Sequence, residues 1–350
     1  MGMEKKSIFE LKAPICLGII TTNRCNLMCK HCMNSATSEN IVDELSTDEI
    51  KDIINQSCEA DIKYIEFNGG EFFVRDDCEV LLDYAIERNI KVTITTNGTL
   101  ISDKWINKYK NKISLIRISL DSHIPEIHDS FRGKKGAFKK TTDTIKKLLS
   151  NDYSVTILTT ISKSRLSTFE DFLNYLYELG VHGLHTTLLI PAGRGSDLID
   201  EALSPREHKE FLEKYREYKE KYKKISSFIL LEESPQTCLL EKKDKLKEDY
   251  KTKCGAAFTE VVILNDGYVL PCASFIAIRE QYKIDELNIR NKKIIDIYKN
   301  ADIMKKVRDI ESLKGKCDKC EYLYKCGGGC RAAANVLYED VLAEDPMCWK

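Results

Sequence analysis

The sequence predicts an α/β fold, a partial (β/α)6 TIM-like barrel followed by a cysteine-rich C-terminal domain. β-Branched apolar runs alternate with amphipathic stretches over roughly the first two hundred residues, as in repeated βα units. The chain has 350 residues, enough for two domains. Seven of its 14 cysteines lie after residue 253. The barrel and the cysteine-rich region are therefore expected to be separate units.

Six parallel strands are expected, at residues 15–21, 62–68, 91–96, 113–120, 153–160 and 184–190. Local signals indicate the helices between them. Ser46 with Glu49 fits a capping box, and residues 138–149 have an amphipathic face. We expect a barrel domain at residues 1–204, a charged helical bridge at 205–253 and a cysteine-rich domain at 254–350.

The composition excludes several classes of protein. A net charge of -1, with 31% charged residues, gives no electrostatic footprint for nucleic acid. Residues 1–14 lack the apolar core of a signal peptide, and no later run is long enough to span a membrane. A cytoplasmic protein is expected. Because the cytosol keeps thiols reduced, the cysteines indicate metal binding or catalysis rather than disulfides.

Short motifs follow the first four predicted strands. In parallel α/β barrels, catalytic and binding residues gather at the carboxyl ends of the strands, so these motifs are expected to share one site. In chain order they are Cys25-x3-Cys29-x2-Cys32, Gly69-Gly70-Glu71, Asn97-Gly98 and Ser119-x-Asp121. Three thiolates leave one metal position open for a ligand that is not protein.

The cysteine spacing, with the motifs around it, resembles the radical S-adenosylmethionine (radical SAM) enzymes. In that family the three cysteines bind a [4Fe–4S] cluster whose fourth iron is chelated by S-adenosylmethionine. The resemblance implies reductive cleavage of S-adenosylmethionine to methionine and a 5′-deoxyadenosyl radical, which abstracts hydrogen from a substrate.

The resemblance also implies roles for other residues. Gly69, Gly70 and Glu71 would contact methionine, and Asn97, Ser119 and Asp121 would supply polar contacts to methionine or ribose. Arg132, in "HDSFRG", would pair with a carboxylate of S-adenosylmethionine or substrate, or else face solvent. His31 is assigned no chemical role, because packing explains it equally well.

The C-terminal cysteines form a second pattern: Cys254-x12-Gly267-x4-Cys272, Cys317-x2-Cys320-x5-Cys326-x3-Cys330, and Cys348. It resembles the SPASM domain, a radical SAM extension that carries two auxiliary [4Fe–4S] clusters. The resemblance implies that Cys254, Cys272 and Cys330 hold the first and that Cys317, Cys320, Cys326 and Cys348 hold the second. Cys238 is the candidate fourth ligand of the first; a buried free thiol and a substrate thiolate are the alternatives. Cys16, Cys58 and Cys78 are expected to be core thiols.

Zinc is the alternative metal. The first set lacks a fourth fixed ligand and the usual paired spacing of zinc fingers. In the C-terminal set, Cys-x2-Cys pairs do build zinc ribbons, although the glycines of "CGGGC" favour a bulky cluster because they admit close backbone approach. The expected cofactors are three [4Fe–4S] clusters and S-adenosylmethionine.

SPASM enzymes commonly oxidise peptides, and sometimes small molecules. The first expectation is oxidation or cross-linking of a ribosomally made peptide, aided by a separate leader-recognition protein, since only 24 residues precede Cys25. A flavodoxin- or ferredoxin-type protein would donate electrons. Formylglycine formation is not expected, because Ala273 stands where sulfatase-maturing members have an aspartate.

Two alternatives remain. One is oxidation or decarboxylation of a small molecule such as a tetrapyrrole. Arg194, in "IPAGRG", would then clamp a carboxylate, although it could equally contact S-adenosylmethionine or cap its strand. The other is a non-catalytic iron–sulfur or zinc module, which does not explain why two motifs follow successive strands.

Overall fold

Parallel strands make up the centre of the structure, a computed structural model that describes residues 11–39, 43–225, 228–232, 234–240 and 254–350. Within these residues, nine strands form one sheet in the order β7-β6-β5-β4-β3-β2-β1-β8-β9. They are β1 (Cys16–Ile20), β2 (Tyr64–Asn68), β3 (Lys91–Thr96), β4 (Leu115–Ser119), β5 (Val155–Ile161), β6 (Gly183–Leu188), β7 (Ile229–Glu232), β8 (Glu260–Ile263) and β9 (Val269–Leu270). All neighbours are parallel except β8 and β9.

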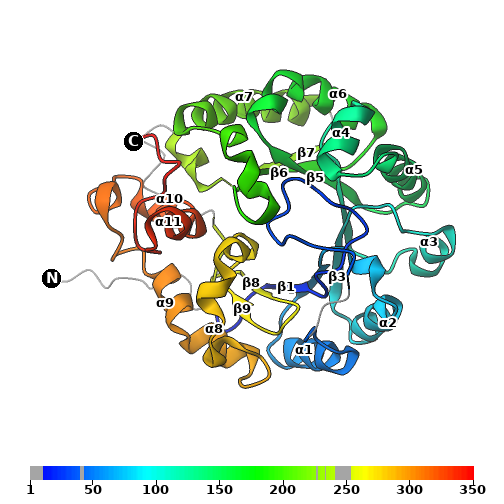
Figure 1. Cartoon of the computed structure of the whole chain (residues 1–350), viewed down its shortest axis with the longest axis horizontal. Coiled ribbons are helices and arrows are strands. Elements are labelled where there is room, and N and C mark those ends of the chain that lie inside the picture. The colour runs from blue at the N-terminus through cyan, green and yellow to red at the C-terminus, as the bar shows by residue number, and fades with distance from the viewer. Residues whose placement is uncertain (1–10, 40–42, 226–227, 233, 241–253) are drawn as a thin grey trace.

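Helices cover the outside of this curved sheet (Figure 1). The α-helices are α1 (Thr47–Glu59), α2 (Cys78–Glu87), α3 (Asp103–Tyr109), α4 (Pro125–Arg132), α5 (Ala137–Leu149), α6 (Phe169–Leu179), α7 (Pro205–Ile225), α8 (Ile294–Asn300), α9 (Asp302–Arg308), α10 (Leu323–Cys326) and α11 (Arg331–Tyr338). Short 3-10 segments include Phe72–Val74, Lys163–Thr168, Gly193–Glu201, Pro235–Leu240 and Ala273–Tyr282. The capping box expected at α1 is present: the Ser46 hydroxyl and the Glu49 carboxylate each accept from the other's backbone N–H.

The predicted partial barrel and its six strands are confirmed, and the structure adds strands at both edges of that sheet. β7 lies in the bridge and pairs with β6, so the bridge is not entirely helical. α7 has the expected narrow apolar stripe, including the buried side chains of Phe211 and Tyr215. The second charged stretch of the bridge, residues 241–253, lies outside the described residues.

β8 is contributed by the cysteine-rich region and extends the barrel sheet beyond β1, with Cys16 opposite Glu260 and Ile19 opposite Ile263. β1 therefore lies between β2 and β8, and its Leu17 and Ile19 are fully buried. An apolar strand paired on both sides suits the centre of a parallel sheet. The strand that leads into the first cysteine motif is thus held from both sides.

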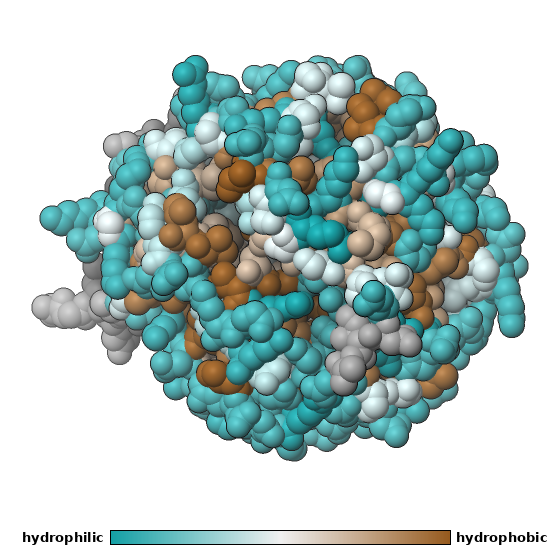
Figure 2. Space-filling view, in the orientation of Figure 1, coloured by the Kyte–Doolittle hydropathy of each residue, from teal (hydrophilic) through white to brown (hydrophobic). Residues whose placement is uncertain are grey.

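The part of the cysteine-rich region that follows β9 lies beside the barrel, with its C-terminal end next to α7 (Figure 1). On this face of the molecule, hydrophobic side chains gather where the barrel meets that region (Figure 2). No helix in the described part of the chain is long and apolar enough to cross a membrane.

Candidate cluster and cofactor site

The first cysteine motif lies on the loop after β1, and an N–H group is directed at each of its thiols. The backbone N–H of Leu27 donates to Cys25 Sγ (3.4 Å), and that of Ala36 donates to Cys32 Sγ (3.4 Å). Arg132 Nη1 lies 3.9 Å from Cys29 Sγ. Donors directed at sulfur stabilise thiolates, the form that binds iron. The loop thus provides three sulfur ligands suited to a cluster.

Burial has the opposite effect from these donors, because it favours the protonated form of the metal-free thiols. It raises the pKa of Cys25 to about 12 and also raises that of Cys29, although the Arg132 guanidinium lowers the latter in part. Both thiols are therefore protonated at neutral pH without metal. Because a metal-bound cysteine is deprotonated outright, binding of a cluster would release these protons. The donor set fits a [4Fe–4S] cluster.

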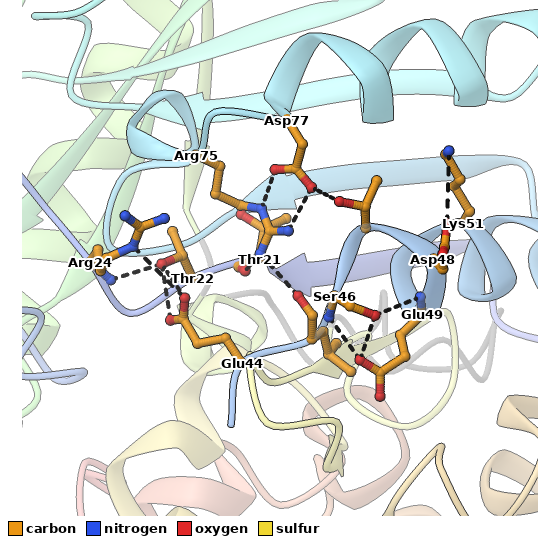
Figure 3. Close-up of polar contacts among 12 residues, drawn as sticks. Thr21, Thr22, Arg24, Glu44, Ser46, Asp48, Glu49, Lys51, Arg75 and Asp77 are labelled. Carbon is orange, nitrogen blue, oxygen red and sulfur yellow. Dashed lines mark hydrogen bonds and ion pairs between the residues drawn. The ribbon is translucent and has the colours of Figure 1, made fainter. Parts of the chain in front are cut away.

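Two charged side chains hold the start of this cysteine loop (Figure 3). Glu44 accepts hydrogen bonds from Thr22 Oγ1 (2.9 Å) and from the backbone N–H of Asn23 (2.6 Å). Arg75 donates to the carbonyl oxygens of Thr21 (2.7 Å) and Leu45 (3.1 Å). Arg75 is itself oriented by Asp77, which accepts two of its N–H groups. These contacts hold the chain between the end of β1 and Cys25 in place.

Arg194 holds the rest of the loop. Its backbone N–H donates to Cys32 O (3.1 Å), its Nε to Cys29 O (3.0 Å) and its Nη1 to Ala36 O (2.6 Å). Its Nη2 is buried without a hydrogen-bond partner among the described residues. A Cβ on Gly193 would lie 2.4 Å from Met33 O, and φ there is +57°, so glycine allows this close approach. Most of the guanidinium binds the loop, so the predicted carboxylate clamp would have only Nη2 available.

Gly69 and Gly70 run directly against the same loop. The N–H of Gly70 donates to Thr22 O (2.7 Å), and a Cβ on Gly70 would lie 2.4 Å from Arg24 O. A Cβ on Gly69 would lie 2.8 Å from Thr22 O. The two glycines are thus explained by packing against the cysteine loop, which is a different reason from the predicted approach to methionine.

The Glu71 carboxylate is buried between β2 and β3. It accepts hydrogen bonds from Thr96 Oγ1 (2.8 Å) and from the backbone N–H groups of Asn97 (2.8 Å) and Phe73 (3.2 Å). Burial raises the pKa of Glu71, and these donors oppose the rise. Two oxygens can accept about four hydrogen bonds, which leaves capacity for a further donor such as an ammonium group.

The Asn97 side chain reaches the cysteine loop. Its Nδ2 donates to Asn26 Oδ1 (2.9 Å), and its Oδ1 accepts from the Thr99 hydroxyl (2.6 Å). Ser119 is buried at the carboxyl end of β4. The residues predicted after the first four strands therefore lie at one end of the barrel.

Asp121 is the centre of a buried ionic triad. Its Oδ2 accepts from Arg132 Nε (2.6 Å), and its Oδ1 lies 3.1 Å from Arg165 Nη1. Burial alone would raise the pKa of Asp121, but the two guanidinium groups hold it well below its usual range. The predicted alternative of a solvent-facing Arg132 is wrong, because this side chain is 9% exposed and pairs with Asp121. The ion pair also occupies groups that were predicted to contact S-adenosylmethionine or substrate.

Arg165 was missed by the sequence analysis. It follows β5, so extending the strand-end rule to the fifth strand would have found it. Its Cζ lies 3.5 Å from the centre of the Phe131 ring, and His31 stacks on the same ring at 4.1 Å. Burial lowers the pKa of His31 to about 3, so its ring is neutral. These contacts agree with a packing role for His31.

The predicted second auxiliary set gathers in one place. Cys317, Cys320, Cys326 and Cys348 line a single pocket, together with Asp345. Burial of the Cys317 thiol is the main reason why its pKa is raised, to about 11. The four thiols come from three neighbouring segments, and their number would suit a closed set of cluster ligands.

The predicted first auxiliary set lies beside it. Burial raises the pKa of Cys272 well above its usual value, and Glu260 and the nearby thiols of Cys254 and Cys330 raise it further. Cys272 and Cys330 immediately precede the 3-10 segment Ala273–Tyr282 and α11, and these two elements contact each other. Cys330 is connected to the other set through Asp345, whose carboxylate accepts from the backbone N–H groups of Cys330 and Met347. In the described part of the chain, no group of three or more His, Cys, Asp or Glu side chains is arranged to hold a single metal ion.

Cys238 lies beside the second auxiliary set, whereas the sequence analysis assigned it to the first. The 3-10 segment that carries it packs on α10, and its fully buried side chain contacts Tyr322 and Cys326. Its thiol forms a hydrogen bond with that of Cys326. Because these contacts are with the second set, we propose that Cys238 is not the fourth ligand of the first set.

Replacing Cys238 with alanine is expected to leave the cluster on Cys254, Cys272 and Cys330 unchanged. Mössbauer spectroscopy and iron counting on the reconstituted variant would measure this, with Cys254→Ala as the matched substitution that removes a ligand of that set. Loss of the same spectral component in both variants would show that Cys238 is a ligand after all.

Comparisons with known proteins agree with this architecture. Residues 19–176 match the Radical SAM superfamily, and residues 254–321 match the SPASM iron–sulfur cluster-binding domain. The chain is 31% identical to an AdoMet-dependent heme synthase of Methanosarcina barkeri, over 96% of each chain. It is 28% identical to the subtilosin biosynthesis protein AlbA of Bacillus subtilis, over 91% of this chain and 68% of that one.

The fold is similar to that of Streptococcus suis SuiB bound to S-adenosylmethionine. The TM-score is 0.78 at 18% identity, and the match covers 97% of this chain and 78% of SuiB. The chain belongs to the radical SAM superfamily and carries a SPASM domain. It is therefore a radical SAM enzyme, with binding of [4Fe–4S] clusters and S-adenosylmethionine implied by both domains.

Proposed function

We propose that this enzyme oxidises its substrate by hydrogen abstraction. We also propose that it works in the cytoplasm and that it uses three [4Fe–4S] clusters. The observation that carries the proposal is the cysteine loop, with an N–H donor directed at each of its three thiols. When bound there, the cluster supplies the electron that cleaves S-adenosylmethionine to methionine and a 5′-deoxyadenosyl radical, which removes a hydrogen atom from the substrate.

The protein's own residues position this chemistry. Arg194 and Glu44 fix the two halves of the cysteine loop, so the open corner of a bound cluster would have a defined orientation. Glu71 retains acceptor capacity for the ammonium group of S-adenosylmethionine. The buried N–H groups on Arg165 Nη2 and Arg194 Nη2 lack acceptors among the described residues, and a carboxylate would satisfy them.

The two C-terminal thiol sets support an oxidative outcome. Hydrogen abstraction leaves a substrate radical, and forming a closed-shell product from it requires the removal of one more electron. Iron–sulfur clusters exchange single electrons. We assign the auxiliary clusters that role, with a flavodoxin- or ferredoxin-type protein supplying the electron for cleavage of S-adenosylmethionine.

A tetrapyrrole is one candidate substrate. The similarity to a heme synthase extends over 96% of both chains, which favours chemistry on a porphyrin side chain, including decarboxylation. Buried arginines near the cysteine loop suit a substrate that carries carboxylates. This candidate corresponds to the alternative in the sequence analysis.

A ribosomally made peptide is the other candidate, and it was the first expectation from the sequence. The similarity to AlbA, a bacteriocin biosynthesis protein, favours it. A cross-link or another oxidative change on the peptide would use the same clusters, with a leader-recognition protein as an additional partner.

The proposal is tested by anaerobic purification, reconstitution with iron and sulfide, reduction with dithionite, and measurement of 5′-deoxyadenosine. We expect the product to form with S-adenosylmethionine alone and faster with substrate. Iron coproporphyrin III and short peptides encoded beside the gene serve as the two probes, and the probe that accelerates formation and gains a new mass identifies the class. Stoichiometric zinc with no 5′-deoxyadenosine would sink the radical proposal.

Replacing Cys348 with alanine is expected to separate cleavage from product formation. The variant loses one of four thiols in the second set, which lies outside the cysteine loop after β1, so uncoupled 5′-deoxyadenosine should still form. Product should fall below detection, because the auxiliary electron acceptor is impaired. Liquid chromatography with mass detection measures both compounds in one reaction. Normal turnover by this variant would refute the auxiliary role.

A further inference from the structure

Arg331 is a buried guanidinium whose hydrogen bonding is incomplete in the described structure. It begins α11 and is 3% exposed. Its Nη1 donates to the carbonyl oxygens of Val341 (3.1 Å) and Ala343 (2.5 Å). Its Nε and Nη2 are buried without hydrogen-bond partners among the described residues. Buried N–H groups of a charged side chain are normally satisfied, so an acceptor is expected beside them.

The unpaired Nη2 of Arg331 lies next to Gly328, a residue that lines the four-cysteine pocket. Gly328 lines that pocket together with Cys317 and Cys326. A Cβ built on Gly328 would lie 3.0 Å from both Cζ and Nη2 of Arg331. The guanidinium therefore lies against a residue of the pocket that the four cysteines line.

Asp345 is a buried carboxylate that lines the same pocket, but in the described part of the chain its hydrogen bonds are all with groups other than Arg331. Its carboxylate accepts from Gln236 Nε2 and from the backbone N–H groups of Cys330 and Met347. No ion pair joins it to Arg331 among the described residues. Sulfur atoms in the pocket are the remaining acceptors of suitable charge.

The glycine run of "CGGGC" follows from the same geometry. Gly328 and Gly329 have φ values of +81° and +77°, which other residues rarely adopt. A Cβ at Gly328 would also lie 2.4 Å from Leu313 Cδ1, and one at Gly329 would lie 2.2 Å from Asp345 Oδ2. Glycine is needed at both positions because φ is positive and because Leu313, Arg331 and Asp345 lie against them.

We propose that Arg331 donates hydrogen bonds to the sulfur atoms of the cluster held by Cys317, Cys320, Cys326 and Cys348, and thereby raises its reduction potential. The inference rests on the proposed function, which assigns a cluster to this set. A positive charge and N–H donors stabilise the reduced cluster more than the oxidised one, because the reduced cluster carries one more negative charge. Arg331 thus makes this cluster a better electron acceptor.

The test is a redox titration of Arg331→Leu, followed by electron paramagnetic resonance. The Arg331→Leu protein and the reference protein with Arg331 both carry Cys25→Ala, Cys29→Ala and Cys32→Ala, so only the signals of the auxiliary clusters remain. The signal that disappears in Cys320→Ala identifies the relevant cluster. In Arg331→Leu we expect the equilibrium between the reduced and oxidised forms of this cluster to shift at least tenfold toward the oxidised form. For a one-electron couple, a tenfold shift is a decrease of 59 mV in the reduction potential. The other auxiliary signal should move less.

Arg308→Leu is the matched control. This arginine belongs to the same region, but its Nε and Nη2 donate to the carbonyl oxygens of Ala257 (2.7 Å) and Tyr298 (2.6 Å), so its loss should not move this potential. If Arg331→Leu fails to retain iron, Arg331→Lys keeps the charge without the planar fork and should give a smaller decrease.

An unchanged potential at full iron content in both Arg331 variants would overturn the inference and leave the proposed function standing. If the unmodified protein held no iron on these four cysteines, the proposed function and the inference would both fail. Iron counting before the titration distinguishes the two outcomes.

Discussion

Replacing Cys25 with alanine is expected to abolish formation of 5′-deoxyadenosine. A cluster on the loop after β1 has three protein ligands, and the N–H of Leu27 is directed at this one. Without it, the remaining two thiols cannot fix a cubic cluster with one corner open to S-adenosylmethionine. Anaerobic assays with dithionite should show no product above the no-enzyme control, and iron content should fall by the content of one cluster.

Cys16→Ala is the matched control, because Cys16 begins β1, at the opposite end of the strand from the cysteine loop. That variant should retain iron and cleavage activity, apart from any loss of stability. Equal loss of cleavage in both variants would mean that disruption of β1, rather than removal of a cluster ligand, explains the result. Retention of cleavage by Cys25→Ala would contradict the site.

Replacing Asp121 with asparagine is expected to destabilise the fold by about 3–5 kcal/mol, the usual cost of breaking a buried ion pair from one side. The substitution leaves Arg132 and Arg165 buried without their counter-charge. It also releases Arg132 from its position beside Cys29. Urea unfolding of the apoprotein measures the stability change without contribution from clusters.

The pH dependence follows from the lowered pKa of Asp121. A carboxylate with a depressed folded-state pKa contributes stability above its unfolded pKa of about 3.9, and this is lost as pH falls toward the folded value. The stability difference between wild type and Asp121→Asn should therefore be constant from pH 6 to 8 and narrow only in acid. Asp143→Asn, which removes an exposed carboxylate beside Lys139, should behave like the wild type at neutral pH. A difference that narrowed near pH 7 would contradict the ionic triad.

Local patterns predicted the six barrel strands because each is a β-branched run bounded by turn or helix signals. β7 was not predicted: it has four residues and lies inside a charged segment. The pairing of β8 with β1 joins residues far apart in the chain, and no local pattern specifies that contact. The cysteine-rich region was therefore predicted as a separate unit, although it shares the barrel sheet.

For the candidate site, the resemblance to the radical SAM and SPASM families implied which cysteines group together, and the strand-end rule predicted the end of the barrel. Neither predicts what a long side chain contacts. Arg194 holds the cysteine loop from a position far along the chain, and Arg132 pairs with Asp121 inside the protein. Cys238 was assigned by its distance in sequence from Cys254, whereas the packing of its segment on α10 determines its neighbours.

The position of β1 between β2 and β8 has a consequence for biosynthesis. β1 is translated before β8, so its second neighbour is made only when residues 260–263 are translated. Until then one edge of β1 lacks its final partner, and chaperones or transient contacts must protect it. The cysteine loop that follows β1 reaches its final support late. A metal centre on that loop would therefore gain its full structural support only after residues 260–263 have been translated and β8 has joined the sheet.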